Sequence, residues 1–194
     1  MSSHHTLVLH TEVIHEKAAR VALGIFFFVA VTALGAYVRV PIKGTPVPIT
    51  LQTFFVILSG AVLGRRSGAA SQLIYGTLGM LGIPLFSGYA SGIAHLSGPT
   101  GGYIVGFILA SLIVGYLTEK SYHNKFGIFL AFAVGMLTVL VCGSAWLSVV
   151  LSISLKHAFT IGFLPFLPGD CVKTLLAYTI FLRIAPRARA IFLA

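Results

Sequence analysis

Long runs without a charged residue constrain this chain more than any other feature. One extends from Phe126 to Leu155, and others extend from Val21 to Val38 and from Tyr103 to Thr118. A transmembrane α-helix needs about 20 predominantly apolar residues, so these runs predict helices that cross a membrane. Only 9% of the 194 residues are Asp, Glu, Lys or Arg, against about a quarter in a soluble domain. The composition therefore excludes a multidomain enzyme with a large soluble core.

Clusters of proline and glycine separate the apolar segments into helices and long loops. The three expected loops cover residues 39–48, 84–102 and 156–169. No helix is expected in the first loop, because proline breaks helices. The segment between the first two loops carries only two charges, Arg65 and Arg66, which predicts a helical hairpin with a basic tip. With a last helix from about Asp170, the sequence predicts an all-α integral membrane protein, a six-helix transmembrane bundle.

Two further boundaries follow from the lengths of the segments. Residues 1–17 are predicted to be a disordered polar tail, and residues 18–194 a single transmembrane domain. The first apolar run is longer than the apolar core of about 7–15 residues in a secretory signal, so it is expected to stay as a helix. The run that begins at Phe126 is longer than one crossing needs, which predicts that its end bends or leaves the bilayer near Gly143 or Trp146.

The distribution of the basic residues predicts the orientation in the membrane. One set of connections carries Lys17, Arg20, Arg65, Arg66, Lys120, Lys125, Arg183, Arg187 and Arg189. The opposite set carries only Arg39, Lys43 and Lys156. Because basic residues are enriched in cytoplasmic loops, both termini are predicted to be cytoplasmic, in a multi-pass protein of the plasma membrane. The basic residues are dispersed, so the bilayer is the expected partner and nucleic acid is not.

Candidate binding residues gather on the predicted outer side. Asp170 is the chain's only Asp, and it shares a helix face with Lys173 three residues later. Ionisable groups in a membrane segment are costly and mark functional sites, although an Asp after Pro-Gly is also a good helix N-cap. The other candidates in or beside the outer loops are Lys43, Gln52, Tyr89, His95 and Tyr103. Further polar residues of these loops are Arg39, Thr45, Thr50, Ser87, Ser91, Ser97 and Thr100.

Small residues and missing motifs narrow the function further. Ala18 and Ala22 are four residues apart, a spacing that suits either packing within the bundle or docking of another membrane protein. The same spacing at Gly60, Gly64 and Gly68 predicts close packing within the bundle.

A single Asp cannot form an aspartyl protease pair, and no phosphate-binding loop is present, so neither catalysis nor ATP hydrolysis is expected. No cofactor is expected, and no metal site, since His95 has no second His at ligand spacing.

Four motifs stand in order along the chain: VPITLQTFF (47–55), GRRSGAASQLIY (64–75), GPTGGYIVGF (98–107) and PFLPGDCVK (165–173). Their combination resembles the BioY family, the biotin-specific substrate-binding S components of energy-coupling-factor (ECF) vitamin transporters. The resemblance implies six helices, a biotin pocket closed by outer loops, and complexes with a transmembrane coupling protein and two cytoplasmic ATPases. It also implies that Asp170 and Lys173 take part in biotin binding and that Ala18 and Ala22 dock the coupling protein.

The expected function is the capture of biotin at the outer face for uptake. Biotin offers ureido N–H donors, a ureido carbonyl, an apolar bicycle with a valeryl chain, and a carboxylate. Asp170 can accept from the N–H groups, Lys173 can donate to the carbonyl or balance charge, and Lys43 can meet the carboxylate. Two alternatives remain open at this point: an S component for another vitamin, and a membrane scaffold without a ligand.

Overall fold

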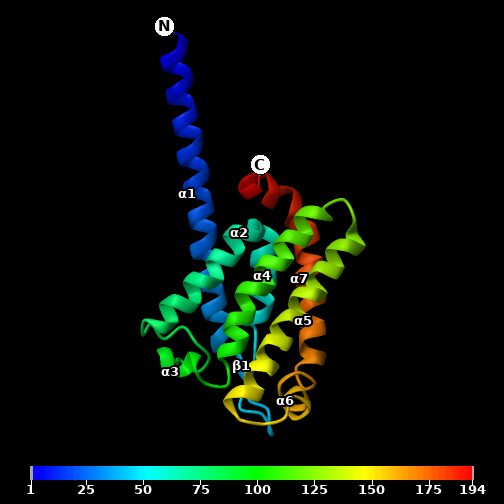
Figure 1. Cartoon of the computed structure of the whole chain (residues 1–194). Coiled ribbons are helices and arrows are strands. Elements are labelled where there is room, and N and C mark those ends of the chain that lie inside the picture. The colour runs from blue at the N-terminus through cyan, green and yellow to red at the C-terminus, as the bar shows by residue number, and fades with distance from the viewer. Residues whose placement is uncertain (1, 194) are drawn as a thin grey trace.

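The computed structural model describes residues 2–193, with side chains from Glu16 onward, and helices dominate it (Figure 1). The long helices are α1 (Ser2–Tyr37), α2 (Gln52–Met80), α4 (Gly101–Lys120), α5 (Lys125–Val150) and α7 (Leu167–Ala188). The short ones are α3 (Ile93–Leu96), α6 (Leu155–Gly162) and the π-helix η1 (Arg189–Leu193). The N-terminal part of α1 projects beyond the other helices, whereas η1 folds back beside α1 and α2.

Within residues 2–193, three helices are long and apolar enough to cross a membrane: the Glu16–Tyr37 part of α1, then α4 and α5. The pair formed by α6 and Leu167–Leu193, bent by 58° at the break, adds a fourth if it is taken as one span. These helices agree with the prediction of an integral membrane protein. Length and composition alone give three or four spans, which is a coarser result than the predicted six.

The helix α2 consists of two arms that meet at Gly64. The backbone there has φ 80° and ψ 172°, a conformation that glycine adopts without the penalty of a Cβ. The chain reverses at this point. The reversal is evident from the close approach of its two arms: a Cβ placed on Gly68 would lie only 2.7 Å from the Cα of Gly60. The predicted hairpin is therefore confirmed, with its turn directly before Arg65.

Glycines also allow the backbones of α2 and α4 to touch. A Cβ on Gly60 would collide with the backbone of Ser111, and one on Gly115 would collide with the backbone of Arg65. The Ser59 and Ser111 hydroxyls, 3.0 Å apart, form a hydrogen bond across the same interface. Close approach at small residues is how helices pack in lipid, so the predicted packing role of Gly60 and Gly68 is confirmed.

The start of α1 differs from the sequence prediction. The helix already begins at Ser2, within the segment expected to be a disordered tail. Residues 2–17 contain neither proline nor glycine, so no residue with a strong helix-breaking tendency separates them from the apolar run. Glu16 and Arg20 stand one turn apart, with 3.5 Å between Glu16 Oε2 and Arg20 Nη2.

The expected bend near Gly143 or Trp146 is wrong, because α5 continues through both residues to Val150. Gly143 serves packing instead of breaking the helix: the ring of Tyr103 occupies the place where a Cβ would stand. Trp146 Nε1 donates a hydrogen bond to the carbonyl of Gly98 at 3.0 Å and so ties α5 to the second loop.

The long loops contain short regular elements that the sequence did not predict. In the first loop, β1 (Arg39–Val40) pairs antiparallel with β2 (Ile49–Thr50), with Arg39 opposite Thr50. This ribbon contains no helix, as the prolines predicted. The third loop contains α6, whose N-cap Ser154 accepts a hydrogen bond from the His157 N–H at 3.3 Å. Proline falls after α6, and Pro168 lies in the first turn of α7, where its missing N–H does no harm.

Candidate functional site

A cavity lies at the end of the bundle where the three long loops meet. Its polar lining consists of Thr50, Gln52, Thr53, Ser87, His95, Thr100, Asp170 and Lys173. Its apolar and aromatic lining includes Val47, Tyr75, Phe86, Tyr103, Phe107, Leu140 and Phe166. A largely apolar cavity with a few convergent polar groups is typical of a small-molecule binding site.

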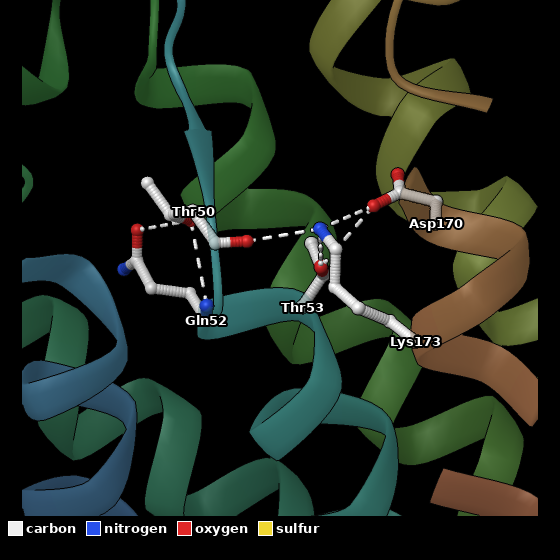
Figure 2. A network of polar contacts seen from close by, with 5 residues as sticks. All are labelled: Thr50, Gln52, Thr53, Asp170 and Lys173. Atoms are coloured by element: carbon white, nitrogen blue, oxygen red, sulfur yellow. Dashed lines mark hydrogen bonds and ion pairs between the residues drawn. The ribbon is translucent and has the colours of Figure 1, made fainter. Parts of the chain in front are cut away.

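A buried ion pair forms one wall of this cavity. Asp170 and Lys173 are 2% and 8% exposed. Lys173 Nζ donates to Asp170 Oδ1 at 2.5 Å, to Thr53 Oγ1 at 3.0 Å and to the Thr50 carbonyl at 2.9 Å (Figure 2). An ammonium group has three N–H donors, so the protein itself uses all of them. The pair therefore joins α7 to β2 and to the start of α2.

The position of Asp170 in α7 excludes the role of helix N-cap. The N-cap is Phe166, and the Asp170 N–H already donates to the Phe166 carbonyl at 2.9 Å, as inside a helix. The carboxylate does not cap the helix: its Oδ1 accepts hydrogen bonds from Lys173 and, at 3.5 Å, from the Thr53 hydroxyl. None of these bonds uses Oδ2, so Asp170 presents an acceptor at the cavity wall.

Gln52 and Tyr103 line the cavity as predicted, but both are engaged with the protein. Gln52 Nε2 donates to the Tyr75 hydroxyl at 2.6 Å, and Tyr75 in turn donates to the Leu85 carbonyl at 3.0 Å. The Tyr103 hydroxyl donates to the Gly162 carbonyl at 2.6 Å. These bonds connect the two arms of α2 with the second loop, and α4 with α6, so both residues shape the cavity.

His95 also lines the cavity, on the side of the second loop. Its Nε2 lies 3.0 Å from the Thr100 hydroxyl, and its ring stacks on Phe86 with 5.2 Å between the centroids. Burial lowers the pKa of His95 below its ordinary value of 6.5, because desolvation disfavours the charged form. Burial therefore favours the neutral imidazole.

The structure does not bring Lys43 and Tyr89 to the cavity. Lys43 is exposed in the first loop and is absent from the lining. Tyr89 is 69% exposed and stacks on Tyr37 with 4.5 Å between the ring centroids. Its backbone has φ 59°, an uncommon conformation for a residue other than glycine, which fits a tight turn in the second loop. The sequence placed both residues in the right loops but could not give the direction of their side chains.

Ala18 and Ala22 lie on α1, away from the cavity. Both are exposed, and with Lys17, Val21 and Ile25 they line a shallow surface groove. Their side chains therefore do not pack inside the bundle, which leaves this face of α1 open.

Several lining residues were missed as candidates. Thr53 and Tyr75 belong to two of the motif segments. Because the chain reverses at Gly64, Tyr75 returns to the end of the bundle where Thr53 lies. The predicted hairpin was therefore enough to place both residues at the same end. Phe86 and Phe107 were hidden among the chain's many other apolar residues. Ser87 was a candidate as a polar residue of the second loop, but its buried hydroxyl without a hydrogen-bond partner among the described residues is a property that no sequence pattern reveals.

The chain is similar in sequence to several known proteins and in structure to a solved one. A probable biotin transporter BioY of Pyrococcus horikoshii is 44% identical over 164 residues, which cover 84% of this chain and 94% of that protein. The biotin transporter BioY of Thermotoga maritima is 37% identical over 157 residues, covering 81% of this chain and 90% of the relative. A crystal structure of the S-component for biotin from an ECF-type ABC transporter superposes with a TM-score of 0.81. It is 28% identical, and the match covers 89% of this chain and 93% of that one.

The family match spans almost the whole chain. The BioY family model matches residues 7–190, which include the ribbon, the α2 hairpin, the second loop and the buried ion pair of α7. The cavity and its polar wall thus lie within the segment that defines the family, and the chain belongs to the BioY family.

Proposed function

We propose that this protein is the biotin-binding membrane subunit of an uptake transporter. The relatives are named biotin transporters, and the solved structure that it resembles is an S-component for biotin. The observation that carries the proposal is the buried Asp170–Lys173 pair in the wall of an otherwise apolar cavity. The protein is a transporter subunit and not an enzyme.

The cavity suits the two chemical halves of biotin. The free Oδ2 of Asp170 accepts a ureido N–H, and a hydrogen bond to a charged group contributes about 1.5–3 kcal/mol. The aromatic and aliphatic lining buries the bicycle and the valeryl chain, at about 25 cal/mol per Å² of apolar surface. Because all three donors of Lys173 are engaged, Lys173 acts by balancing the charge of Asp170 and fixing its position, not by donating to the ureido carbonyl.

The experiment that tests this function identifies the ligand directly. Protein purified in detergent is denatured, the released small molecules are identified, and the purified protein is titrated with biotin. Biotin among the released molecules, or tight binding in the titration, supports the proposal. Release of another vitamin would favour an S component of different specificity, and no binding after biotin titration would favour a membrane scaffold.

The proposed arrangement in the plasma membrane has six crossings and both termini in the cytoplasm. The two arms of α2 supply two crossings in addition to the spans that length and composition identify. Nine basic residues on one side against three on the other support the orientation. Lys43→Cys is then labelled by an impermeant reagent from outside, and Arg66→Cys only from inside. Labelling of Arg66→Cys from outside would overturn the orientation.

The proposed partners are an ECF coupling protein and two ATPase subunits. This chain has no phosphate-binding loop, so any ATP hydrolysis belongs to the partners. The exposed Ala18 and Ala22 support α1 as the docking face. Ala22→Leu should weaken assembly with the coupling protein and leave biotin affinity unchanged, whereas Ala30→Leu, on an exposed position of the same helix, is the control. Loss of biotin affinity with intact assembly would assign Ala22 to the fold instead.

A further inference from the structure

The structure assigns a subsite for the carboxylate of the ligand to Arg39 and Ser87, at the meeting of the first and second loops. We propose that the Arg39 guanidinium and the Ser87 hydroxyl bind the anionic end of the molecule whose polar ring is held by Asp170. This inference rests on the proposed function and joins Ser87, which lines the cavity, with Arg39, an exposed residue of the first loop that contacts the second loop next to Ser87. It replaces Lys43, the residue that the sequence favoured for this role.

The first observation is the position of the Arg39 side chain. A Cβ on Gly88 would collide with Arg39 Nη1 and would lie 3.3 Å from Cζ, so the guanidinium lies directly against the second loop. Gly88 has φ +78°, and its lack of a side chain makes the approach possible. Arg39 also stands opposite Thr50 in the ribbon, and Thr50 lines the cavity. Arg39 is therefore next to two lining residues, opposite Thr50 in the ribbon and against the glycine that follows Ser87.

The second observation is an unused hydroxyl on the residue that precedes Gly88. Ser87 precedes Gly88 and lines the cavity, and its Oγ is buried without a hydrogen-bond partner among the described residues. Buried polar atoms in folded proteins are almost always bonded, so an exception calls for an explanation. A ligand oxygen is such a partner, because a hydroxyl donates to a carboxylate and Ser87 lines the cavity.

Charge balance points to the same place. The outer loops and the start of α7 contain a single carboxylate, Asp170, and Lys173 neutralises it. The Arg39 side chain makes no ion pair or hydrogen bond with the residues whose side chains the structure describes. The mouth of the cavity thus carries uncompensated positive charge, which attracts an anion. A guanidinium also matches the geometry of a carboxylate better than an ammonium group does.

The second loop is held in the geometry that this subsite requires. The Tyr37 hydroxyl at the end of α1 donates to the Pro84 carbonyl at 2.8 Å, and the Tyr37 ring stacks on Tyr89. These contacts bracket Ser87 and Gly88 from both sides along the chain. Only Val38 separates Tyr37 from the strand that carries Arg39. The same end of α1 therefore positions both Arg39 and the loop that contains Ser87.

The test compares biotin with biotinamide, in which a neutral amide replaces the carboxylate. Purified wild-type protein should bind biotin about tenfold more tightly than biotinamide, the effect of losing one charge-assisted hydrogen bond. Arg39→Gln should abolish this preference by weakening biotin while leaving biotinamide unchanged. Lys43→Gln, an exposed cation of the same loop, is the matched control and should keep the full preference.

The Ser87 half of the subsite has its own control. Ser87→Ala should weaken biotin, whereas Ser97→Ala, an exposed serine of the same loop, should not. Full preference for biotin in Arg39→Gln, or loss of the preference in Lys43→Gln, would overturn the assignment. Equal binding of both compounds by the wild type would also overturn it and leave the biotin function standing. Failure of the wild type to bind either compound would remove both proposals.

Discussion

Two ion pairs stand at opposite ends of this molecule, and their environments differ sharply. In the cavity, the side chains of Lys173 and Asp170 are 10% and 3% exposed, with 2.5 Å between Lys173 Nζ and Asp170 Oδ1. At the Gly64 turn, the side chains of Arg65 and Glu119 are 45% and 33% exposed, with 3.7 Å between Arg65 Nε and Glu119 Oε2. The same pairing of charges is thus enclosed by protein at one end and open at the other.

The difference shows what each pair can do. Removing charges from water costs several kcal/mol per ion, so the buried pair persists only because both partners and added hydrogen bonds compensate each other. The exposed pair contributes about 0.2–1 kcal/mol. Its structural role lies in the Arg65 N–H, which donates to Glu119 Oε1 at 2.8 Å at the start of the second arm of α2. Binding chemistry belongs to the buried pair, and ordering of a turn belongs to the exposed one.

The largest expected effect comes from Lys173→Met, which breaks the buried pair and keeps the apolar stem. Removing one partner of a buried pair costs about 3–5 kcal/mol, because the other charge is left uncompensated. Asp170 is then expected to take up a proton, and biotin affinity should fall by about a hundredfold or more. Thermal unfolding and biotin titration measure the two effects. Lys156→Met, at an exposed lysine of α6, should change neither.

The next effect is that of Asp170→Asn. An amide keeps the size and an acceptor oxygen but loses the charge, so biotin affinity should fall by about ten- to a hundredfold, the loss of one charge-assisted bond. Because Phe166 and not Asp170 is the N-cap, the helix itself should be little affected. Adding Lys173→Met to this variant should weaken binding much less than it does alone. Near-native biotin affinity in Asp170→Asn would remove Asp170 from the binding site.

The sequence predicted the elements that depend on local chemistry. The reversal at Gly64 follows from two arginines between glycines in an apolar segment, and the helix-free ribbon follows from three prolines within 41–48. The buried Asp170–Lys173 pair follows from the i, i+3 spacing of the only Asp. These features are fixed by residues close together in the chain, where pattern and structure correspond.

What the sequence could not give depends on contacts between distant segments. Gly143 looked like a helix break, but it is the contact point for Tyr103, forty residues earlier in the chain. Lys43 and Arg39 are equivalent as basic residues of one loop, and only the position of Gly88 from the second loop distinguishes them. The three engaged donors of Lys173 likewise depend on β2 and α2, which no spacing within α7 predicts.

A smaller effect is expected at the Gly64 turn. Gly64→Ala places a Cβ at φ +80°, 2.6 Å from Leu193 and 2.7 Å from Glu119 Oε1. A strained backbone of this kind costs about 1–3 kcal/mol, and the collision adds to it. The melting temperature should fall, while biotin affinity stays unchanged because the turn is remote from the cavity. Gly82→Ala, at φ +106° with no atom within 4 Å, isolates the backbone strain from the collision.

The smallest effect is expected from Glu119→Gln, and it completes the comparison of the two pairs. Glutamine removes the charge that faces Arg65 but keeps an oxygen that can accept the Arg65 N–H. The loss is therefore limited to the exposed ion pair, about 0.2–1 kcal/mol, and it should shrink further at high salt because screening already weakens the pair. Glu119→Ala should cost more than Glu119→Gln, since it also removes the acceptor at the start of the arm. Equal melting temperatures for the two variants would show that the carboxylate does not order the turn. A drop in biotin affinity in Glu119→Gln would show that the two ends of the molecule are coupled, against the division of roles drawn from their burial.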